Sequence, residues 1–313
     1  TYYRGTSFKK VFARSISKRD REKATKPFKR KWLYQCFGIS KQAYYQRIKF
    51  DFIKEQQHKV VLDLVRKIRI KMPKTGTRKL LEHIQNELIT NNIKMGRDAL
   101  FDLLRSYGLL VKKTKRFHIT TDSKHFFFKS PNLLKDLTLS HAEQVFVSDI
   151  TYIKVDSGHA YLALVTDAYS KKIMGWKLDD NMRVALVKDA LAMAYKNCIH
   201  NHKNIIHHSD RGIQYCCPDF SEFAQNKGFI LSTTQQYDPY ENAVAERING
   251  ILKYEFGLKN TIRNIEIAQK MIAEAVNIYN NERLHWSLDL KTPQTVHKQY
   301  DKQPYKSYAK KAA

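Results

Sequence analysis

A change in hydrophobic period near residue 140 separates two kinds of predicted structure. Before it, apolar side chains recur at helical spacing, as Val61, Leu64 and Ile68 do. After it, Gln144–Val155 is a β-branched and aromatic run bounded downstream by Asp156–Gly158, and such a run predicts a strand. The chain is therefore expected to fold as a helical region followed by a domain that contains a sheet.

The strands and helices predicted beyond residue 140 follow a definite order. Strands are expected at residues 144–155, 160–167, 172–178, 204–208 and 229–233, and helices at 184–195, 218–226, 242–254 and 265–280. Three strands come first, and helices then alternate with single strands. This α/β order matches a ribonuclease-H-like core.

The charge is distributed as unevenly as the predicted structure. The chain carries a formal net charge of +26, of which +23 lies in residues 1–130 and +3 in residues 131–313. Clustered Lys and Arg release counterions from a polyanion, so the first part predicts nucleic-acid binding. An anionic membrane surface would attract the same charge, so charge alone leaves both partners open. The predicted domains are a basic arm at 1–31, a helical DNA-binding region at 32–120, a linker at 121–140, a catalytic core at 141–300 and a basic tail at 301–313.

Composition excludes several classes of protein. A hydrophobic content of 42% and an aromatic content of 12% exclude bulk disorder. Four cysteines in 313 residues do not make a disulfide scaffold, so we expect a reducing, cytoplasmic compartment. The sequence holds no run of 18 apolar residues, and no membrane span is predicted.

The helical region contains the pattern of a helix-turn-helix. A short apolar segment at Trp32–Cys36 is followed by a turn at Gly38 and by a second helix that Ser40 can cap. An ordinary helical hairpin is the alternative, and the basic arm before it fits a solvated tail as well as a phosphate-binding arm. The second helix would present these side chains to a DNA groove: Lys41, Gln42, Tyr44, Tyr45 and Arg47.

Three carboxylates stand out in the predicted core. Asp149 lies inside an apolar strand, where a carboxylate is costly unless a Lys or a cation neutralises it. Asp210 follows a strand and Glu246 lies on a helix, and each alone fits an ordinary turn or a solvated helix surface. Their spacing, with 60 residues between the first two and 35 between the last two, is far more specific.

The motifs around these carboxylates resemble one known family. The resemblance is to the OrfB catalytic subunit of insertion-sequence-three family transposases, which has a retroviral-integrase-like core. It runs through most of residues 32–296, and it departs from the family pattern at Glu241 and Leu284, where Asp and Pro are usual. The segments that carry it are Val147–Ile153, His207–Tyr215, Glu241–Arg247 with Lys253, Tyr279–His285 and Lys291–Pro293.

This resemblance implies both a fold and an activity. The fold would be α/β, a ribonuclease-H-like (integrase) catalytic core preceded by an all-α basic DNA-binding region. The activity would be that of a DNA transposase, a polynucleotidyl transferase that cleaves and joins the ends of its own insertion sequence. Asp149, Asp210 and Glu246 would hold two Mg²⁺ ions per active site, with Mn²⁺ as a substitute, and Asp149 would bridge them. Two such ions about 3.5–4 Å apart stabilise the attacking and leaving oxygens.

The resemblance also implies partners. DNA is expected, as element ends and as target, together with a homo-oligomer of at least two copies, because strand transfer aligns two DNA partners. A subunit from an upstream reading frame is a further expected partner, no membrane is expected, and the location would be the bacterial cytoplasm at the nucleoid. DNA contacts within the core are predicted for Arg211, Asn242, Asn249, Lys253 and Arg283.

One helix face of the core carries a hypothesis of its own. Glu246, Asn249, Gly250 and Lys253 share a face at helical spacing, opposite much of the apolar stripe. Glycine inside a helix costs about 1 kcal/mol relative to alanine, so Gly250 needs a reason. Close approach of DNA supplies one, and packing against another element of the protein supplies another.

A zinc site is a weaker interpretation of the histidines near Asp210. His200, His202, His207 and His208 lie near Cys198, but their spacing contains no clear tetrahedral set. We expect His207 and His208 to pack beside Asp210 instead.

Two other functions compete with the transposase. A catalytically silent DNA-binding regulator derived from a transposase is disfavoured by the intact acidic trio. A ribonuclease that degrades RNA is disfavoured by the long basic region before residue 131.

Overall fold

The structure is a computed structural model of the chain. It describes Tyr34 and residues 38–111, 129–135, 137–200, 203–235 and 242–299. The predicted arm and tail, and the first helix of the predicted helix-turn-helix apart from Tyr34, lie outside the described residues. The chain divides into two compact units, 1–62 and 63–313, and each is described by itself.

One long helix, α3, takes the place of two that the sequence predicts. It spans Lys41–Lys71, and the Ser40 Oγ caps it by accepting a hydrogen bond from the Ala43 N–H at 3.0 Å. The predicted cap is confirmed. The sequence pattern predicts a short helix at residues 41–47 and a separate helix at residues 57–72. These separate helices are wrong, because α3 runs through both ranges without a break. No Gly or Pro lies between the two predicted helices, so nothing in the chain interrupts the turns.

Two shorter helices follow, as the apolar spacing predicts. α4 spans Thr77–Thr90 and α5 spans Arg97–Ser106. Both are amphipathic and each buries one apolar stripe. The buried apolar side chains are Leu80, Ile84 and Leu88 on α4 and Leu100, Leu103 and Leu104 on α5.

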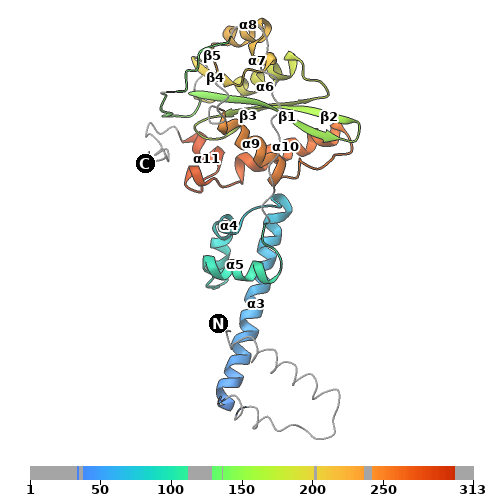
Figure 1. The fold of residues 1–313 in the computed structure, drawn as a ribbon. Coiled ribbons are helices and arrows are strands. Elements are labelled where there is room, and N and C mark those ends of the chain that lie inside the picture. The colour runs from blue at the N-terminus through green and yellow to red at the C-terminus, as the bar shows by residue number, and fades with distance from the viewer. Residues whose placement is uncertain are drawn as a thin grey trace. The chain divides into compact units, whose positions relative to one another are not determined.

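The core is built on a five-stranded mixed sheet. The strands are β1 Val145–Val155, β2 Gly158–Asp167, β3 Ile173–Asp179, β4 Ile205–Ser209 and β5 Phe229–Thr233. Their order across the sheet is β3-β2-β1-β4-β5 (Figure 1). β1, β2 and β3 pair antiparallel, while β4 and β5 continue from β1 in parallel. This is the ribonuclease-H-like arrangement, so the predicted fold class is confirmed.

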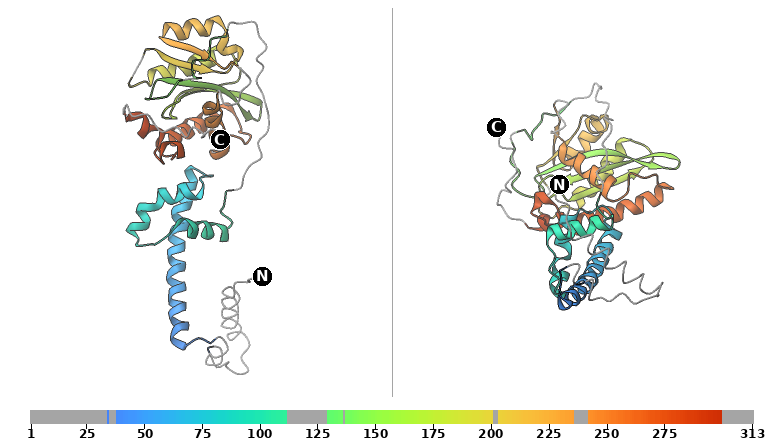
Figure 2. Two further views of the ribbon diagram at one scale, coloured as in Figure 1. Left: turned by 60° about the vertical axis from the view of Figure 1, so that its left-hand side comes forward. Right: turned by 60° about the horizontal axis from the view of Figure 1, so that its bottom comes forward.

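Helices cover both faces of this sheet (Figure 2). One face packs against α6 Val184–Lys196 and α8 Pro218–Asn226, around the buried rings of Phe146 and Phe220. The other face packs against α9 Ala243–Glu255 and α10 Ile265–Asn281. None of the described helices combines the length and the apolar character that crossing a bilayer requires.

Several features of the core were not predicted. The short elements are α7 Ile213–Cys216, the 3₁₀ helix η1 Trp286–Leu288 and α11 Pro293–Lys298. Part of the predicted linker at 121–140 also contacts the core. The Leu133 N–H donates to the Ser232 Oγ at 2.9 Å, and the Thr233 hydroxyl donates to the Ser130 carbonyl at 2.6 Å. This part of the chain therefore runs along β5.

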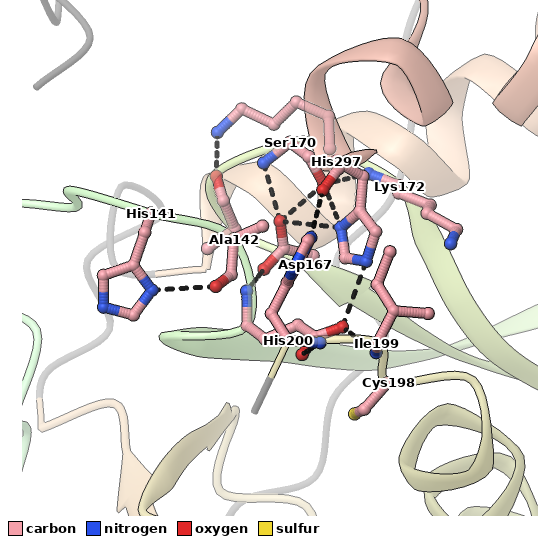
Figure 3. Close-up of polar contacts among 12 residues, drawn as sticks. His141, Ala142, Asp167, Ser170, Lys172, Cys198, Ile199, His200 and His297 are labelled. Atoms are coloured by element: carbon pink, nitrogen blue, oxygen red, sulfur yellow. Dashed lines mark hydrogen bonds and ion pairs between the residues drawn. The ribbon is translucent and has the colours of Figure 1, made fainter. Parts of the chain in front are cut away.

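A group of buried polar side chains, here named the Glu143 cluster, fastens α11 to the core (Figure 3). It consists of Glu143, Asp167, Ser170 and His297, each 0% exposed. His297 lies between the carboxylates, with its Nε2 3.2 Å from Glu143 Oε1 and its Nδ1 3.7 Å from Asp167 Oδ2. Burial alone lowers the pKa of His297, but hydrogen bonds to Asp167 and Glu143 outweigh burial and raise that pKa.

Candidate active site

The pairing of β1 with β4 brings two predicted carboxylates to neighbouring positions. Ser148 pairs with Ser209 in parallel register, and Asp149 and Asp210 are the next residues along the chain. Residues at neighbouring ends of such parallel pairing face a common crevice in α/β folds. Two residues far apart in the sequence thus meet because of the sheet.

Asp149 is partly buried, and the other two carboxylates lie near enough to act on it. Withdrawal from water and the like charge of Asp210 raise the pKa of Asp149 to about 7, with a smaller contribution from Glu246. The Asn249 amide opposes this shift, because its Nδ2 donates to Asp149 Oδ2 at 2.7 Å. The three carboxylates therefore form an electrostatically coupled group that a cation would stabilise.

A tight loop after β4 holds the second carboxylate. The Gly212 N–H donates to Asp210 Oδ1 at 3.0 Å. A Cβ at position 212 would lie 3.0 Å from the same oxygen, closer than nearly all real contacts of this kind. Glycine therefore lets the backbone approach the carboxylate closely enough to bind it.

Helix α9 supplies the third carboxylate and closes the site. The Asn242 Nδ2 donates to the Ser148 carbonyl at 3.1 Å, which ties the start of α9 to β1. Glu246 is exposed one turn later, and Lys253 is half-buried further along the helix. Burial lowers the pKa of Lys253, and the charge of Asp149 raises it, so the ammonium also lies near the site.

The site contains buried polar atoms that have no hydrogen-bond partner among the described residues. They include Asn242 Oδ1, Asn249 Oδ1, His207 Nδ1 and the Tyr215 hydroxyl. Most buried polar atoms in folded proteins are hydrogen-bonded, so these atoms are available to bind a water molecule or a ligand.

His207 and His208 pack beside Asp210, as predicted. Their exposed fractions are 1% and 0%. The His207 Nε2 lies 2.8 Å from the Ser148 Oγ. Burial, with a smaller effect from His208, lowers the pKa of His207 to about 3, so the ring is neutral at physiological pH.

Three of the predicted DNA contacts have other roles in the structure. Asn242 and Asn249 are 7% and 5% exposed, and both donate inside the site rather than facing outward. Arg283 is 3% exposed, and its guanidinium donates two hydrogen bonds of 2.8 Å to Glu255. Their roles toward DNA stay predictions, and the structure adds that each side chain is buried against an acceptor that the sequence pattern did not reveal.

The other predicted DNA contacts lie closer to the surface. Lys41, Gln42, Tyr45 and Arg47 are exposed on α3, while Tyr44 is half-buried with its ring centroid 5.2 Å from that of Tyr34. In the core, Arg211 is half-buried and its Nε donates to the Thr234 carbonyl.

The carboxylates fit a hard divalent cation, although they do not enclose one. In the part of the chain that the structure describes, no three His, Cys, Asp or Glu side chains are grouped closely enough to hold a metal ion. The carboxylates of Asp149, Asp210 and Glu246 therefore do not form a closed set of ligands. Their oxygen atoms, with the buried Asn249 Oδ1 beside them, are the donor type that Mg²⁺ prefers.

Comparisons with known proteins show which family the chain resembles. Residues 140–239 and 227–293 match two descriptions of an Integrase core domain. The chain is 33% identical over 270 residues to an uncharacterized 31 kDa protein of insertion element IS600 from Shigella sonnei, covering 85% of this chain and 97% of that protein.

More distant relatives match parts of the chain. It is 35% identical over 153 residues to transposase InsF for insertion sequence IS3A from Escherichia coli, covering 49% of this chain and 53% of InsF. Among solved structures, a simian T-cell lymphotropic virus intasome in complex with PP2A regulatory subunit B56 gamma aligns with a TM-score of 0.46 and 16% identity, over 79% of this chain and 78% of that one.

Proposed function

The chain belongs to the insertion-sequence-three family of transposases, and on that premise we propose that it cleaves and joins the ends of its own insertion sequence. The reaction would be attack of a 3′-hydroxyl on a DNA phosphodiester. The observation that carries this proposal is the electrostatic coupling of Asp149, Asp210 and Glu246. They come from within β1, from just after β4 and from α9, yet Asp210 and Glu246 both raise the pKa of Asp149.

The three carboxylates would hold two divalent ions, Mg²⁺ or Mn²⁺. Asp149 feels the charge of both other carboxylates, so a cation held by either neighbour would also stabilise the charge of Asp149. When bound, two such ions stabilise charge on the attacking and leaving oxygens of a phosphodiester.

Neighbouring residues would position the carboxylates and the DNA. Asn249 fixes one oxygen of Asp149, and the Gly212 N–H fixes one oxygen of Asp210. Such hydrogen bonds orient metal ligands and limit the rearrangement that binding requires. The half-buried ammonium of Lys253 would bind a phosphate of the DNA end, because it lies near the site and carries charge opposite to the phosphate.

The basic first part of the chain would bind the element ends. It holds +23 of the +26 formal charge, so DNA affinity should fall steeply with salt concentration. Joining two ends to a target requires more than one protomer, and we propose a homo-oligomer of at least two copies, with an upstream-frame DNA-binding subunit as a further partner.

Replacement of Asp149 tests this function. Asp149→Asn should lose both cleavage and joining of a labelled element end in Mg²⁺ or Mn²⁺, because the amide cannot bridge two cations. Its DNA affinity should remain within about threefold of the wild type, since phosphate contacts dominate affinity. Asp156→Asn, an exposed carboxylate in the turn after β1, is the matched control and should keep full activity.

The outcomes separate the transposase from its alternative. Robust cleavage by Asp149→Asn with Mg²⁺ would contradict the proposal that Asp149 binds the metal ions. A wild-type protein that binds the ends but never cleaves them would favour a silent DNA-binding regulator.

A further inference from the structure

Tyr215 buries a hydroxyl group that packing does not explain. The residue is 4% exposed, and its hydroxyl has no hydrogen-bond partner in the described part of the chain. The ring packs between His207 and Phe220, with centroid distances of 5.8 and 5.6 Å. A phenylalanine would make the same ring contacts without burying an unpaired hydroxyl, which costs about 1–3 kcal/mol.

The ring of Tyr215 lies beside the second carboxylate of the acidic site. A Cβ on Gly212 would meet Asp210 Oδ1 at 3.0 Å and Tyr215 Cδ2 at 3.6 Å, so the carboxylate and the ring are neighbours across this glycine. Burial raises the pKa of Tyr215 well above its ordinary value, and the charges of Asp149 and Asp210 raise it further. The hydroxyl therefore keeps its proton and can donate a hydrogen bond to an acceptor that comes within reach.

We propose that Tyr215 is a positioning residue for the cation-bound site, and that its hydroxyl donates a hydrogen bond to the Asp149–Asp210 pair when the carboxylates close on a divalent ion. This inference rests on the proposed function. The two carboxylates repel each other in the cation-free chain, and a cation removes that repulsion and lets them approach. The Tyr215 hydroxyl then has a hydrogen-bond acceptor. The hydrogen bond formed on cation binding therefore offsets the free-energy cost of burying that hydroxyl.

The inference predicts opposite effects on stability and on cation binding. In Tyr215→Phe, the melting temperature without cation should equal or exceed that of the wild type, because an unpaired buried hydroxyl is removed. Its affinity for Mn²⁺ should fall by about 10- to 100-fold, the usual effect of removing a hydrogen bond to a metal ligand. Titration calorimetry with Mn²⁺ on the full chain measures the affinity, and thermal melts with and without Mn²⁺ measure the stability.

The matched control is a buried tyrosine whose hydroxyl already has a partner. Tyr279 is 0% exposed and donates to the Lys171 carbonyl at 2.8 Å. Tyr279→Phe should lower the melting temperature without cation and leave the Mn²⁺ affinity unchanged.

The possible results distinguish this inference from the proposed function. If the wild-type chain and Tyr215→Phe bind Mn²⁺ equally well, Tyr215 only fills space and the inference is overturned while the proposed function survives. If the wild-type chain binds no Mn²⁺, both are overturned. Weaker binding by Tyr215→Phe alone, with no loss of melting temperature, is the result expected.

Discussion

The acidic site and the Glu143 cluster both withdraw carboxylates from water, but they satisfy them differently. In the Glu143 cluster, Glu143 accepts hydrogen bonds from the N–H groups of Ile199 and His200 at 2.7 and 2.8 Å. Asp167 accepts from the N–H groups of Glu143 and Ser170 at 2.8 and 2.7 Å (Figure 3). At the acidic site, Asp149 gains the Asn249 amide but also faces two like charges.

This difference in the partners of the carboxylates shows that burial of a carboxylate does not by itself identify a functional site. In the Glu143 cluster the protein supplies the donors and a histidine, His297, whose pKa is raised by its hydrogen bonds to the two carboxylates, so the group is closed and structural. At the acidic site the nearest charges repel, and unpaired polar atoms surround them. An external cation would stabilise the second arrangement, and that makes it a candidate for metal binding.

Replacing a carboxylate by an amide should therefore have opposite effects in the two regions, and the larger effect is expected in the Glu143 cluster. Asp167→Asn should destabilise the folded chain by about 3–5 kcal/mol, because it leaves the His297 charge short of a partner and turns an N–H donor toward Ser170. Chemical denaturation measures this loss, with Asp156→Asn as the exposed control. A loss below about 1 kcal/mol would show that the cluster is not a closed charge network.

At the acidic site the same replacement should stabilise the cation-free chain. An acid whose folded pKa lies above its unfolded value binds more protons when folded, so the wild type loses stability as pH rises from 3.8 to about 7. Above that window, Asp149→Asn should be more stable than the wild type by up to roughly 4 kcal/mol. Added Mg²⁺ should stabilise the wild type and leave the variant unchanged. Equal denaturation midpoints at pH 8 without cation would contradict the crowding of like charges at this site.

Much of the fold could be predicted from the sequence, because local patterns decide it. The predicted bounds of α8 and β5 agree with the structure, since Pro218 starts the helix and a short β-branched run forms the strand. The acidic trio was likewise found from spacing, and the sheet and α9 then bring its members together.

The remaining features depend on contacts between distant segments. Helical spacing placed Asn249 on the face of Glu246, but only the folded chain shows that its amide donates to Asp149 on β1. Arg283 pairs with Glu255, 28 positions away, and no local pattern reveals that partner. Tyr215 was part of a recognised motif, but its buried hydroxyl becomes evident only once the loop is folded.

The Glu143 cluster should also lose stability as pH rises, because the pKa of its histidine is raised in the folded chain. The folded pKa of His297 is raised, so the stability that it contributes is complete below its ordinary pKa of 6.5 and declines as pH rises through the folded value. His297→Gln should cost roughly 1.5–3 kcal/mol at pH 6, because hydrogen bonds of a charged group are lost. The cost should shrink at higher pH.

Two features of the surroundings shape that experiment. The charge of Lys172 lowers the pKa of His297, and the centroid of the His200 ring lies 5.6 Å from that of His297. Both neighbours are therefore kept unchanged when the pH dependence of His297→Gln is measured. The denaturation series is therefore best made in the Asp149→Asn background, which removes the titration at the acidic site. A cost of His297→Gln that stays constant from pH 6 to 9 would mean that the imidazole is neutral throughout.

The smallest expected effect concerns the face of α9 that carries Glu246, Gly250 and Lys253. A Cβ added at Gly250 would meet nothing within 4 Å, so packing against another described element does not explain this glycine. Gly250→Ala should stabilise the chain by about 0.4–1 kcal/mol, because alanine restricts the unfolded chain and fits a helix interior. Gly250→Leu should fold as well, yet its bulk would stand on the face that carries Glu246 and Lys253. End joining by Gly250→Leu should then fall well below that of Gly250→Ala, while Gln269→Leu, an exposed change on α10, should leave joining unaffected. If Gly250→Leu joins ends as fast as the wild type, DNA does not lie on this face of α9, and the substrate must approach the carboxylates from the β4 side instead.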